Sequence, residues 1–181
     1  MIKKVGVVGA GMMGAEIALC FARAGYDTVL SDVTQELADN GKVKQAAVLD
    51  KNIKKGRITE EDKTATLARV HATADMKDMA DCDLVIEAAL EVLEVKNNIF
   101  KQLDEICKKE TILASNTSSI SITKLAAAVS EERKPQFIGT HFNSPASVMK
   151  LVEVIPALLT AEETIEEVYQ LLVAIEKERS E

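Results

Sequence analysis

The stretch VGVVGAGMMG, which starts at Val5, decides the fold of this chain because it combines a buried strand, a glycine-rich turn and the start of a helix. Its run of valines predicts a strand that is buried on both faces. Gly9, Gly11 and Gly14 follow the G-x-G-x-x-G spacing, and apolar side chains recur at helical intervals over Met12–Ala24. A strand, this turn and a helix in succession indicate a dinucleotide-binding site, whereas the glycine spacing alone is a weak signal.

Each glycine of this turn has its own expected role. Gly9 allows the tight turn, Gly11 lets the backbone approach a pyrophosphate, and Gly14 lets the helix pack against the strand. The start of the helix offers free N–H groups and a partial positive charge to phosphates. We therefore include Met12 and Met13, which lie between the last two glycines, in the expected cofactor site.

Asp32 ends the next expected strand and points to the identity of the dinucleotide. An acid at this place binds the two ribose hydroxyls of NAD and repels the 2′-phosphate of NADP. The surrounding residues, SDVTQE, offer no arginine to a 2′-phosphate. The sequence therefore predicts NAD as the cofactor. The alternative is a glycine-rich turn with a capping aspartate and no ligand.

The rest of the chain alternates short apolar runs with helical patterns. The expected strands are Val5–Gly9, Thr28–Ser31, Asp83–Ala88, Thr111–Ser115, Gln136–Thr140 and Val148–Ile155, and the expected helices are Met12–Ala24, Gln35–Lys55, Thr59–Ala68, Val92–Cys107, Ser121–Val129 and Ala161–Lys177. This order predicts an α/β fold of the doubly wound Rossmann type, with a mostly parallel sheet and helices on both faces. We expect residues 1–181 to form a single domain.

Composition narrows the classes of function. Of 181 residues, 47% are hydrophobic and 28% are charged, as in a globular domain. A net charge of -7 argues against broad nucleic-acid binding, and aromatic residues amount to only 3%. Three widely spaced cysteines indicate neither a disulfide framework nor a metal site. The chain opens on a strand rather than a signal peptide and has no membrane-spanning apolar run, so we expect a cytoplasmic protein of bacterial type.

A second informative stretch, GTHFNSPASVMKLVEVI, contains His141 and Glu153. Histidine is suited to removing a proton near neutral pH, since its unperturbed pKa is about 6.5. An acid between valines is costly to bury unless a cation pairs with it, and His141 is a plausible partner. Two plainer interpretations stay open. His141 could be a structural residue at a strand end, and Glu153 could face water on an edge strand.

Four segments together carry a resemblance to a known family. GAGMMGAEIA, DLVIEAALEVLEVK, ASNTSSISIT and the stretch around His141 resemble the L-3-hydroxyacyl-CoA dehydrogenases, in particular the bacterial 3-hydroxybutyryl-CoA dehydrogenases. The resemblance runs from Val5 to about Ile175. It implies NAD-dependent interconversion of an (S)-3-hydroxyacyl-CoA and a 3-oxoacyl-CoA, with an acyl-CoA as substrate and a homo-oligomer as the assembly.

The resemblance also implies roles for individual residues. His141 matches the base that takes the proton of the 3-hydroxyl while hydride leaves for NAD, and Glu153 matches its acidic partner. Ser118 matches the serine that hydrogen-bonds the reacting oxygen, and Asn116 lies on the nicotinamide side of the cofactor. A loop with helix-capping serines is the alternative for the SNTSS run that holds them.

Further positions match the cofactor and coenzyme A sites of the family. Glu91 and Lys96 match residues that line the cofactor site, and Lys51 and Lys55 match lysines that reach the phosphates of coenzyme A. Lys51 and Lys55 are one helical turn apart, and most such pairs are only a solvated helix face. Their role rests on the resemblance.

Three departures from the family pattern stand out. Ser144 occupies the place of an asparagine, which puts one hydrogen bond to the substrate in doubt; Asn143 is a possible replacement after a local shift. Glu16 occupies the place of a glycine and brings negative charge toward the cofactor phosphates. The chain ends at LLVAIEKERSE, before the second, helical domain of the family.

The early end leaves other functions open. The chain could be an NAD-binding module of little activity, structural or regulatory, because the family's helical domain supplies part of the acyl pocket and the dimer interface. It could also be a Rossmann dehydrogenase of a hydroxy acid that carries no coenzyme A. We expect oxidation of NADH with acetoacetyl-CoA to separate a dehydrogenase from a module, and the double substitution Lys51→Ala/Lys55→Ala to identify a substrate without coenzyme A.

Overall fold

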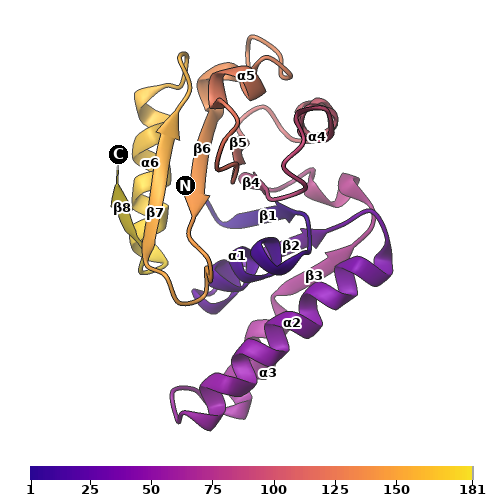
Figure 1. Ribbon diagram of the computed structural model, residues 1–181, viewed down its shortest axis with the longest axis vertical. Coiled ribbons are helices and arrows are strands. Elements are labelled where there is room, and N and C mark those ends of the chain that lie inside the picture. Colours follow the sequence, from indigo (N-terminus) through magenta and orange to yellow (C-terminus); the bar gives the residue numbers. More distant parts are fainter. Residues whose placement is uncertain (181) are drawn as a thin grey trace.

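The structure, a computed structural model, describes residues 1–180 and contains one sheet with helices on both faces (Figure 1). The strands are β1 Lys4–Val8, β2 Asp27–Ser31, β3 Val70–Thr73, β4 Leu84–Glu87, β5 Ile112–Ser115, β6 Phe137–Phe142, β7 Leu151–Pro156 and β8 Glu178–Ser180. The helices are α1 Met12–Arg23, α2 Gln35–Lys54, α3 Glu60–Ala68, α4 Leu93–Ile106, α5 Ile122–Ala126 and α6 Glu162–Ala174, with the 3-10 turns η1 Met76–Met79 and η2 Lys134–Gln136.

The strand order is β3-β2-β1-β4-β5-β6-β7-β8. Strands β1 to β6 are parallel, and β7 lies antiparallel to β6. The fold class expected from the sequence, a doubly wound and mostly parallel sheet, is therefore confirmed. Because β1 has β2 on one side and β4 on the other, the chain reverses its direction of winding at β1, and a crevice opens at the carboxyl ends of β1 and β4.

Two apolar layers hold the helices on the sheet, one on each face. Along β4, Leu84 and Ile86 point to the layer that contains α1 and α6, whereas Val85 points to the layer that contains α4 and α5. This alternation follows from the two-residue period of a strand, and both layers are apolar because a central parallel strand is covered on both faces. Figure 1 shows α6 and α4 on opposite sides of the sheet.

The helices α2 and α3 form a hairpin between β2 and β3 that projects away from the sheet (Figure 1). Thr34 caps α2 by accepting a hydrogen bond from the Leu37 N–H, and Thr59 and Asp62 form a reciprocal capping box at α3. The Lys63 ammonium lies 2.7 Å from an oxygen of Asp50, which ties the two helices together.

Some boundaries differ from the expected ones for local reasons. The last long helix ends at Ala174 rather than Lys177 because Glu176 adopts a left-handed conformation with φ 63°. The strand expected to start at Val148 starts at Leu151, since the N–H groups of Val148 and Met149 donate to the Pro145 carbonyl in a turn. The helix expected from Ser121 to Val129 is reduced to α5 and a following turn.

The short strands β3 and β8 were not expected from the sequence. β3 has the residues VHAT at the edge of the sheet, where Val70 and Thr73 are buried and His71 is exposed. Four residues with one large apolar side chain give no periodic signal. Within residues 1–180, no helix combines the length and the apolar character that a membrane span requires.

Candidate active site

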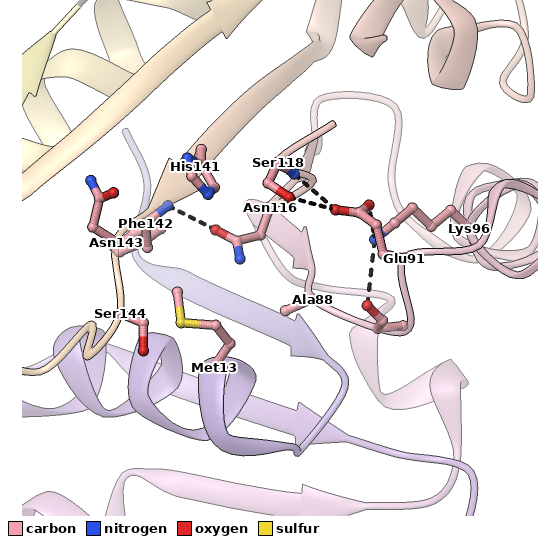
Figure 2. A pocket seen from close by; sticks show the side chains of 11 residues that line it. Met13, Ala88, Glu91, Lys96, Asn116, Ser118, His141, Phe142, Asn143 and Ser144 are labelled. Carbon is pink, nitrogen blue, oxygen red and sulfur yellow. Dashed lines mark hydrogen bonds and ion pairs between the residues drawn. The ribbon is translucent and has the colours of Figure 1, made fainter. Parts of the chain in front are cut away.

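A cavity of about 280 Å³ lies at the carboxyl ends of the central strands, beside the start of α1 (Figure 2). Segments that are far apart in the sequence meet there, because the carboxyl ends of parallel strands lie on one edge of a sheet. Its lining residues are Met13, Ala88, Ala89, Glu91, Lys96, Asn116, Ser118, His141, Phe142, Asn143 and Ser144. Seven of the fifteen predicted site residues are among them, namely Met13, Glu91, Lys96, Asn116, Ser118, His141 and Ser144, whereas Met12, which is 70% exposed, is not.

The glycine corner has the geometry that a bound pyrophosphate requires. A Cβ on Gly14 would lie 1.6 Å from the Gly9 carbonyl oxygen, and Gly9 itself has a φ of +107°. A Cβ on Gly11 would meet nothing within 4 Å, so open space lies above the backbone there. Gly11 is also the N-cap of α1 and supplies no side chain to the first-turn N–H groups. These N–H groups are left for an anion.

Asp32 braces the same corner from the end of β2. One carboxylate oxygen accepts a hydrogen bond of 2.8 Å from the Ala10 N–H, and the other accepts one of 2.7 Å from the Val33 N–H. A carboxylate oxygen can accept more than one hydrogen bond, so both oxygens keep capacity for ribose hydroxyls. Lys44, which the sequence did not single out, donates to the Ala10 carbonyl from α2 and brings a cation to this corner.

His141 and Glu153 lie directly opposite each other on β6 and β7. The His141 Nδ1 is 3.3 Å from a Glu153 oxygen. The prediction that Glu153 is a buried acid is wrong, because its side chain is 45% exposed. It is neither buried nor on an edge strand, since β8 pairs with β7 on the other side. With Nδ1 toward the carboxylate, Nε2 is the nitrogen left for a substrate.

Asn116 connects the loop after β5 to the end of β6. Its Oδ1 accepts a hydrogen bond of 2.8 Å from the Phe142 N–H, next to His141. This bond fixes the orientation of the side-chain amide, and Figure 2 shows the amide nitrogen pointing into the cavity. Asn116 can therefore hold the strand that carries His141 and also donate to a ligand.

Ser118 is held by Glu91, which follows β4. The Ser118 N–H and hydroxyl both donate to one Glu91 oxygen, at 2.9 and 3.0 Å, and the Thr117 hydroxyl donates to the other at 2.5 Å. Burial raises the pKa of Glu91, but the hydrogen bonds from Thr117 and Ser118 together lower it by a larger amount. Its pKa therefore lies below the ordinary value. Ser118 must turn away from Glu91 before it can donate to a substrate oxygen.

Lys96 lies beneath this loop in a buried ionic pair that the sequence did not reveal. Its ammonium is 2.6 Å from an oxygen of Glu87 at the end of β4, and the two side chains are 2% and 0% exposed. Glu87 also accepts hydrogen bonds from the Ser115 hydroxyl and the Ala89 N–H. The signal that could have identified Glu87 is an acid inside the apolar run DLVIEA, the same signal that drew attention to Glu153.

The departures from the family pattern have structural consequences. The Asn143 side chain donates to the Leu151 carbonyl at 3.0 Å and closes the β6–β7 connection, so its amide nitrogen is engaged. Ser144 faces the cavity beside Met13 (Figure 2). Glu16 is 9% exposed and accepts a hydrogen bond from the Ser147 hydroxyl at 3.0 Å, which turns its carboxylate to the β6–β7 connection.

Lys51 and Lys55 are not brought to the cavity. Both are exposed at the end of α2, on the hairpin that projects from the sheet, and neither lines the cavity. Their coenzyme A role stays a prediction.

A parallel sheet with a glycine corner at its switch point and an acid at the end of the second strand defines a dinucleotide-binding α/β domain. Comparison with protein families makes the assignment specific, since residues 4–179 match the model described as "3-hydroxyacyl-CoA dehydrogenase, NAD binding domain". The chain belongs to this family, and NAD is its cofactor.

Individual relatives agree with this assignment. The chain is 50% identical over 161 residues to a probable 3-hydroxybutyryl-CoA dehydrogenase from Deinococcus radiodurans, covering 89% of this chain and 57% of that protein. It is 48% identical over 166 residues to a 3-hydroxybutyryl-CoA dehydrogenase from Bradyrhizobium diazoefficiens, covering 92% and 56%. The crystal structure of (S)-3-hydroxybutyryl-CoA dehydrogenase from Ralstonia eutropha superimposes with a TM-score of 0.95 at 43% identity, covering 99% of this chain and 62% of that one.

The chain thus spans little more than half the length of these curated relatives. Similarity at this level establishes the family. The roles of individual residues, the assembly and the compartment stay predictions.

Proposed function

We propose that this chain is the NAD-binding part of a 3-hydroxyacyl-CoA dehydrogenase that interconverts (S)-3-hydroxybutyryl-CoA and acetoacetyl-CoA. The observation that carries the proposal is the cavity, where His141, Ser118 and Asn116 meet beside the glycine corner. A proton acceptor, two hydrogen-bonding groups and a dinucleotide corner are the parts that oxidation of an alcohol by hydride transfer requires.

The residues of the corner fit NAD. Gly11 and the first turn of α1 would hold the pyrophosphate, Asp32 would hold the adenosine ribose, and Asn116 and His141 would face the nicotinamide end. NAD, when bound, supplies the hydride acceptor for the carbon that carries the alcohol.

His141 then acts as the base of the reaction. Glu153 accepts a hydrogen bond from the Nδ1–H, which leaves the lone pair of Nε2 free for the 3-hydroxyl of the substrate. As the hydride leaves carbon 3, the hydroxyl proton passes to Nε2 and a ketone forms. The imidazolium is stabilised by Glu153, and its 24% exposure lets the proton pass on to water.

Ser118 and Asn116 orient the reacting oxygen. The Ser118 hydroxyl donates to Glu91 in the absence of substrate. Rotation about one side-chain bond turns it away from Glu91 and lets it donate to the substrate instead. The Asn116 amide nitrogen has a fixed direction because its oxygen is engaged by Phe142. Two donors that face one oxygen stabilise the negative charge that develops there during reduction of the ketone.

Lys51 and Lys55 extend this proposal to coenzyme A. A phosphate at the end of α2 would meet two cations one helical turn apart, and a long pantetheine arm would connect it to the cavity. The double substitution Lys51→Ala/Lys55→Ala is expected to raise the Michaelis constant for acetoacetyl-CoA. An unchanged Michaelis constant would favour a hydroxy acid without coenzyme A.

A second candidate is an NAD-binding module of little activity. It is favoured by the exposure of Leu151 and Ile155, 40% and 37%, on the same face of β7 as Glu153. Apolar side chains beside a reaction site are usually covered by another part of the protein or by substrate. The proposed homo-oligomer offers one such cover.

Oxidation of NADH in the presence of acetoacetyl-CoA separates the two candidates. A dehydrogenase consumes NADH only when the acyl-CoA is added. A module binds NADH in calorimetry but leaves its absorbance unchanged over many hours. Failure to bind NADH would contradict both.

A further inference from the structure

Three charged side chains, Glu87, Lys96 and Glu91, lie together beside the cavity, and two of them, Lys96 and Glu91, line it. They lie on the end of β4, on α4 and on the connection between them. The Lys96 ammonium is 2.6 Å from Glu87 and 3.5 Å from Glu91. Glu87 also accepts hydrogen bonds from the Ser115 hydroxyl at 2.6 Å and the Ala89 N–H at 2.7 Å, so both of its oxygens have a partner although the side chain is 0% exposed.

The charges in this cluster do not cancel. One ammonium faces two carboxylates, which leaves a net charge of -1 (one positive and two negative groups). The closer contact and the deeper burial assign Lys96 to Glu87, because a charge pair is strongest where water is excluded. The uncompensated charge therefore rests on Glu91, which is 39% exposed and lines the cavity. The pKa of Glu91 lies below its ordinary value, which keeps this charge present at neutral pH.

Without Glu87, Lys96 would neutralise Glu91 instead. Glu87 thus acts through Lys96 and determines whether the wall of the cavity is negative or neutral. It has no contact with the cavity itself, since it is not among the lining residues.

We propose that Glu87 is a positioning residue that keeps a net negative charge beside the nicotinamide, and so favours binding of NAD⁺ over NADH. The inference rests on the proposed function, which puts the nicotinamide in this cavity. The oxidised ring carries a positive charge and the reduced ring carries none. A nearby negative charge therefore stabilises the oxidised form alone, while contacts to the rest of the dinucleotide are common to both forms.

The experiment measures the dissociation constants of NAD⁺ and NADH for the chain by calorimetry. Glu87→Gln makes the cluster neutral in total, and a glutamine can still accept from the Ala89 N–H and Lys96 while donating to the Ser115 hydroxyl. We expect the dissociation constant of NADH divided by that of NAD⁺ to fall on the order of three- to tenfold. This is the effect expected when a partly screened charge acts across the cavity.

Two further variants separate charge from structure. The double substitution Glu87→Gln/Lys96→Met returns the cluster to a net charge of -1 on Glu91 and is expected to restore the wild-type ratio. Glu94→Gln removes the same charge from an exposed position in the first turn of α4 and is the matched control. It should leave the ratio within about twofold, because that charge is screened by water.

The outcomes distinguish this inference from the proposed function. Wild-type binding with an unchanged ratio in Glu87→Gln, or an equal shift in Glu94→Gln, would overturn the inference alone. If the wild type bound neither nucleotide, the proposed function would be overturned as well. If Glu87→Gln fails to fold, the triple variant Glu87→Gln/Lys96→Met/Glu91→Gln removes the same net charge. A ratio of dissociation constants that does not fall in this variant would overturn the inference.

Discussion

Two carboxylates lie beside the same cavity, each paired with a nitrogen-bearing side chain, and the two pairs differ in their contact with water. Glu87 and Lys96 are 0% and 2% exposed, whereas Glu153 and His141 are 45% and 24% exposed. The carboxylate of the buried pair has further hydrogen-bond donors around it, while the half-exposed pair faces both water and the cavity. A group that exchanges protons during a reaction needs a path to water. A group that maintains a constant charge acts more strongly when it is shielded from water. This difference is the reason why we propose His141 as the proton acceptor and Glu87 as the residue that maintains a fixed charge.

The buried pair can be broken most severely by removing its cation. Lys96→Met leaves the Glu87 carboxylate without its charge partner in the core, and we expect the free energy of unfolding to fall by about 3–5 kcal/mol in denaturant titration. The double substitution Glu87→Gln/Lys96→Met should recover most of this loss. A loss below about 1 kcal/mol for Lys96→Met would mean that the pair is not shielded from water as described.

The half-exposed pair should respond in the opposite way, through activity rather than stability. His141→Gln removes the proton acceptor, and we expect turnover of acetoacetyl-CoA and NADH to fall by about 10²–10⁴-fold with an unchanged melting temperature. His71→Gln is the control, because His71 is exposed on β3 and contacts Asp78 instead. Turnover that survives His141→Gln within a few-fold would remove His141 from the mechanism.

The comparison extends to the glycine corner, where one position is packed and another is open. Gly14→Ala puts a Cβ against the Gly9 carbonyl and should prevent correct folding, whereas Gly11→Ala meets nothing within 4 Å and should leave the melting temperature unchanged. We expect Gly11→Ala to weaken NADH binding on the order of tenfold, since the added methyl occupies space that the pyrophosphate needs. Calorimetry beside thermal unfolding tests both halves, and unchanged NADH affinity in Gly11→Ala would argue that the dinucleotide lies elsewhere.

The smallest expected effect concerns Glu91, whose side chain is 39% exposed, a fraction similar to those of the half-exposed pair. Its pKa is lowered in the folded state, so it contributes stability above its unfolded pKa, and this contribution is lost as the pH falls through the folded value. After allowance for solvent screening, we expect Glu91→Gln to cost on the order of 0.5 kcal/mol at neutral pH and nothing in acid. Unfolding titrations at both pH values measure the difference, and an equal cost at both would mean that its ionised form is not the one stabilised.

The fold could be predicted from the sequence because its signals are local. The valine run before Gly9 and the turn from Gly9 to Gly14 specify a buried strand and its following helix within ten residues. The edge strand β3 could not be predicted, since its pairing with β2 is set by the return of the α2–α3 hairpin rather than by its own four side chains.

The site was predicted unevenly for a related reason. Residues inside motifs, such as His141 and Ser118, were identified by resemblance, and strand register does bring His141 opposite Glu153. The Glu87–Lys96 pair depends on which face of β4 meets α4, and the orientation of Asn116 depends on a bond to Phe142 across 26 residues. Neither contact is encoded by spacing along the chain.

The central claim is that the dinucleotide lies across the glycine corner with its nicotinamide beside His141. A crystal structure of the chain with NADH tests it most directly. We expect the pyrophosphate over Gly11 and the nicotinamide ring in the cavity, with its reactive face toward Nε2 of His141 and space for the substrate between the ring and the imidazole. A nicotinamide ring bound outside the cavity would contradict this claim. So would a ring whose hydride-bearing carbon presents its hydride on the side away from the His141 imidazole.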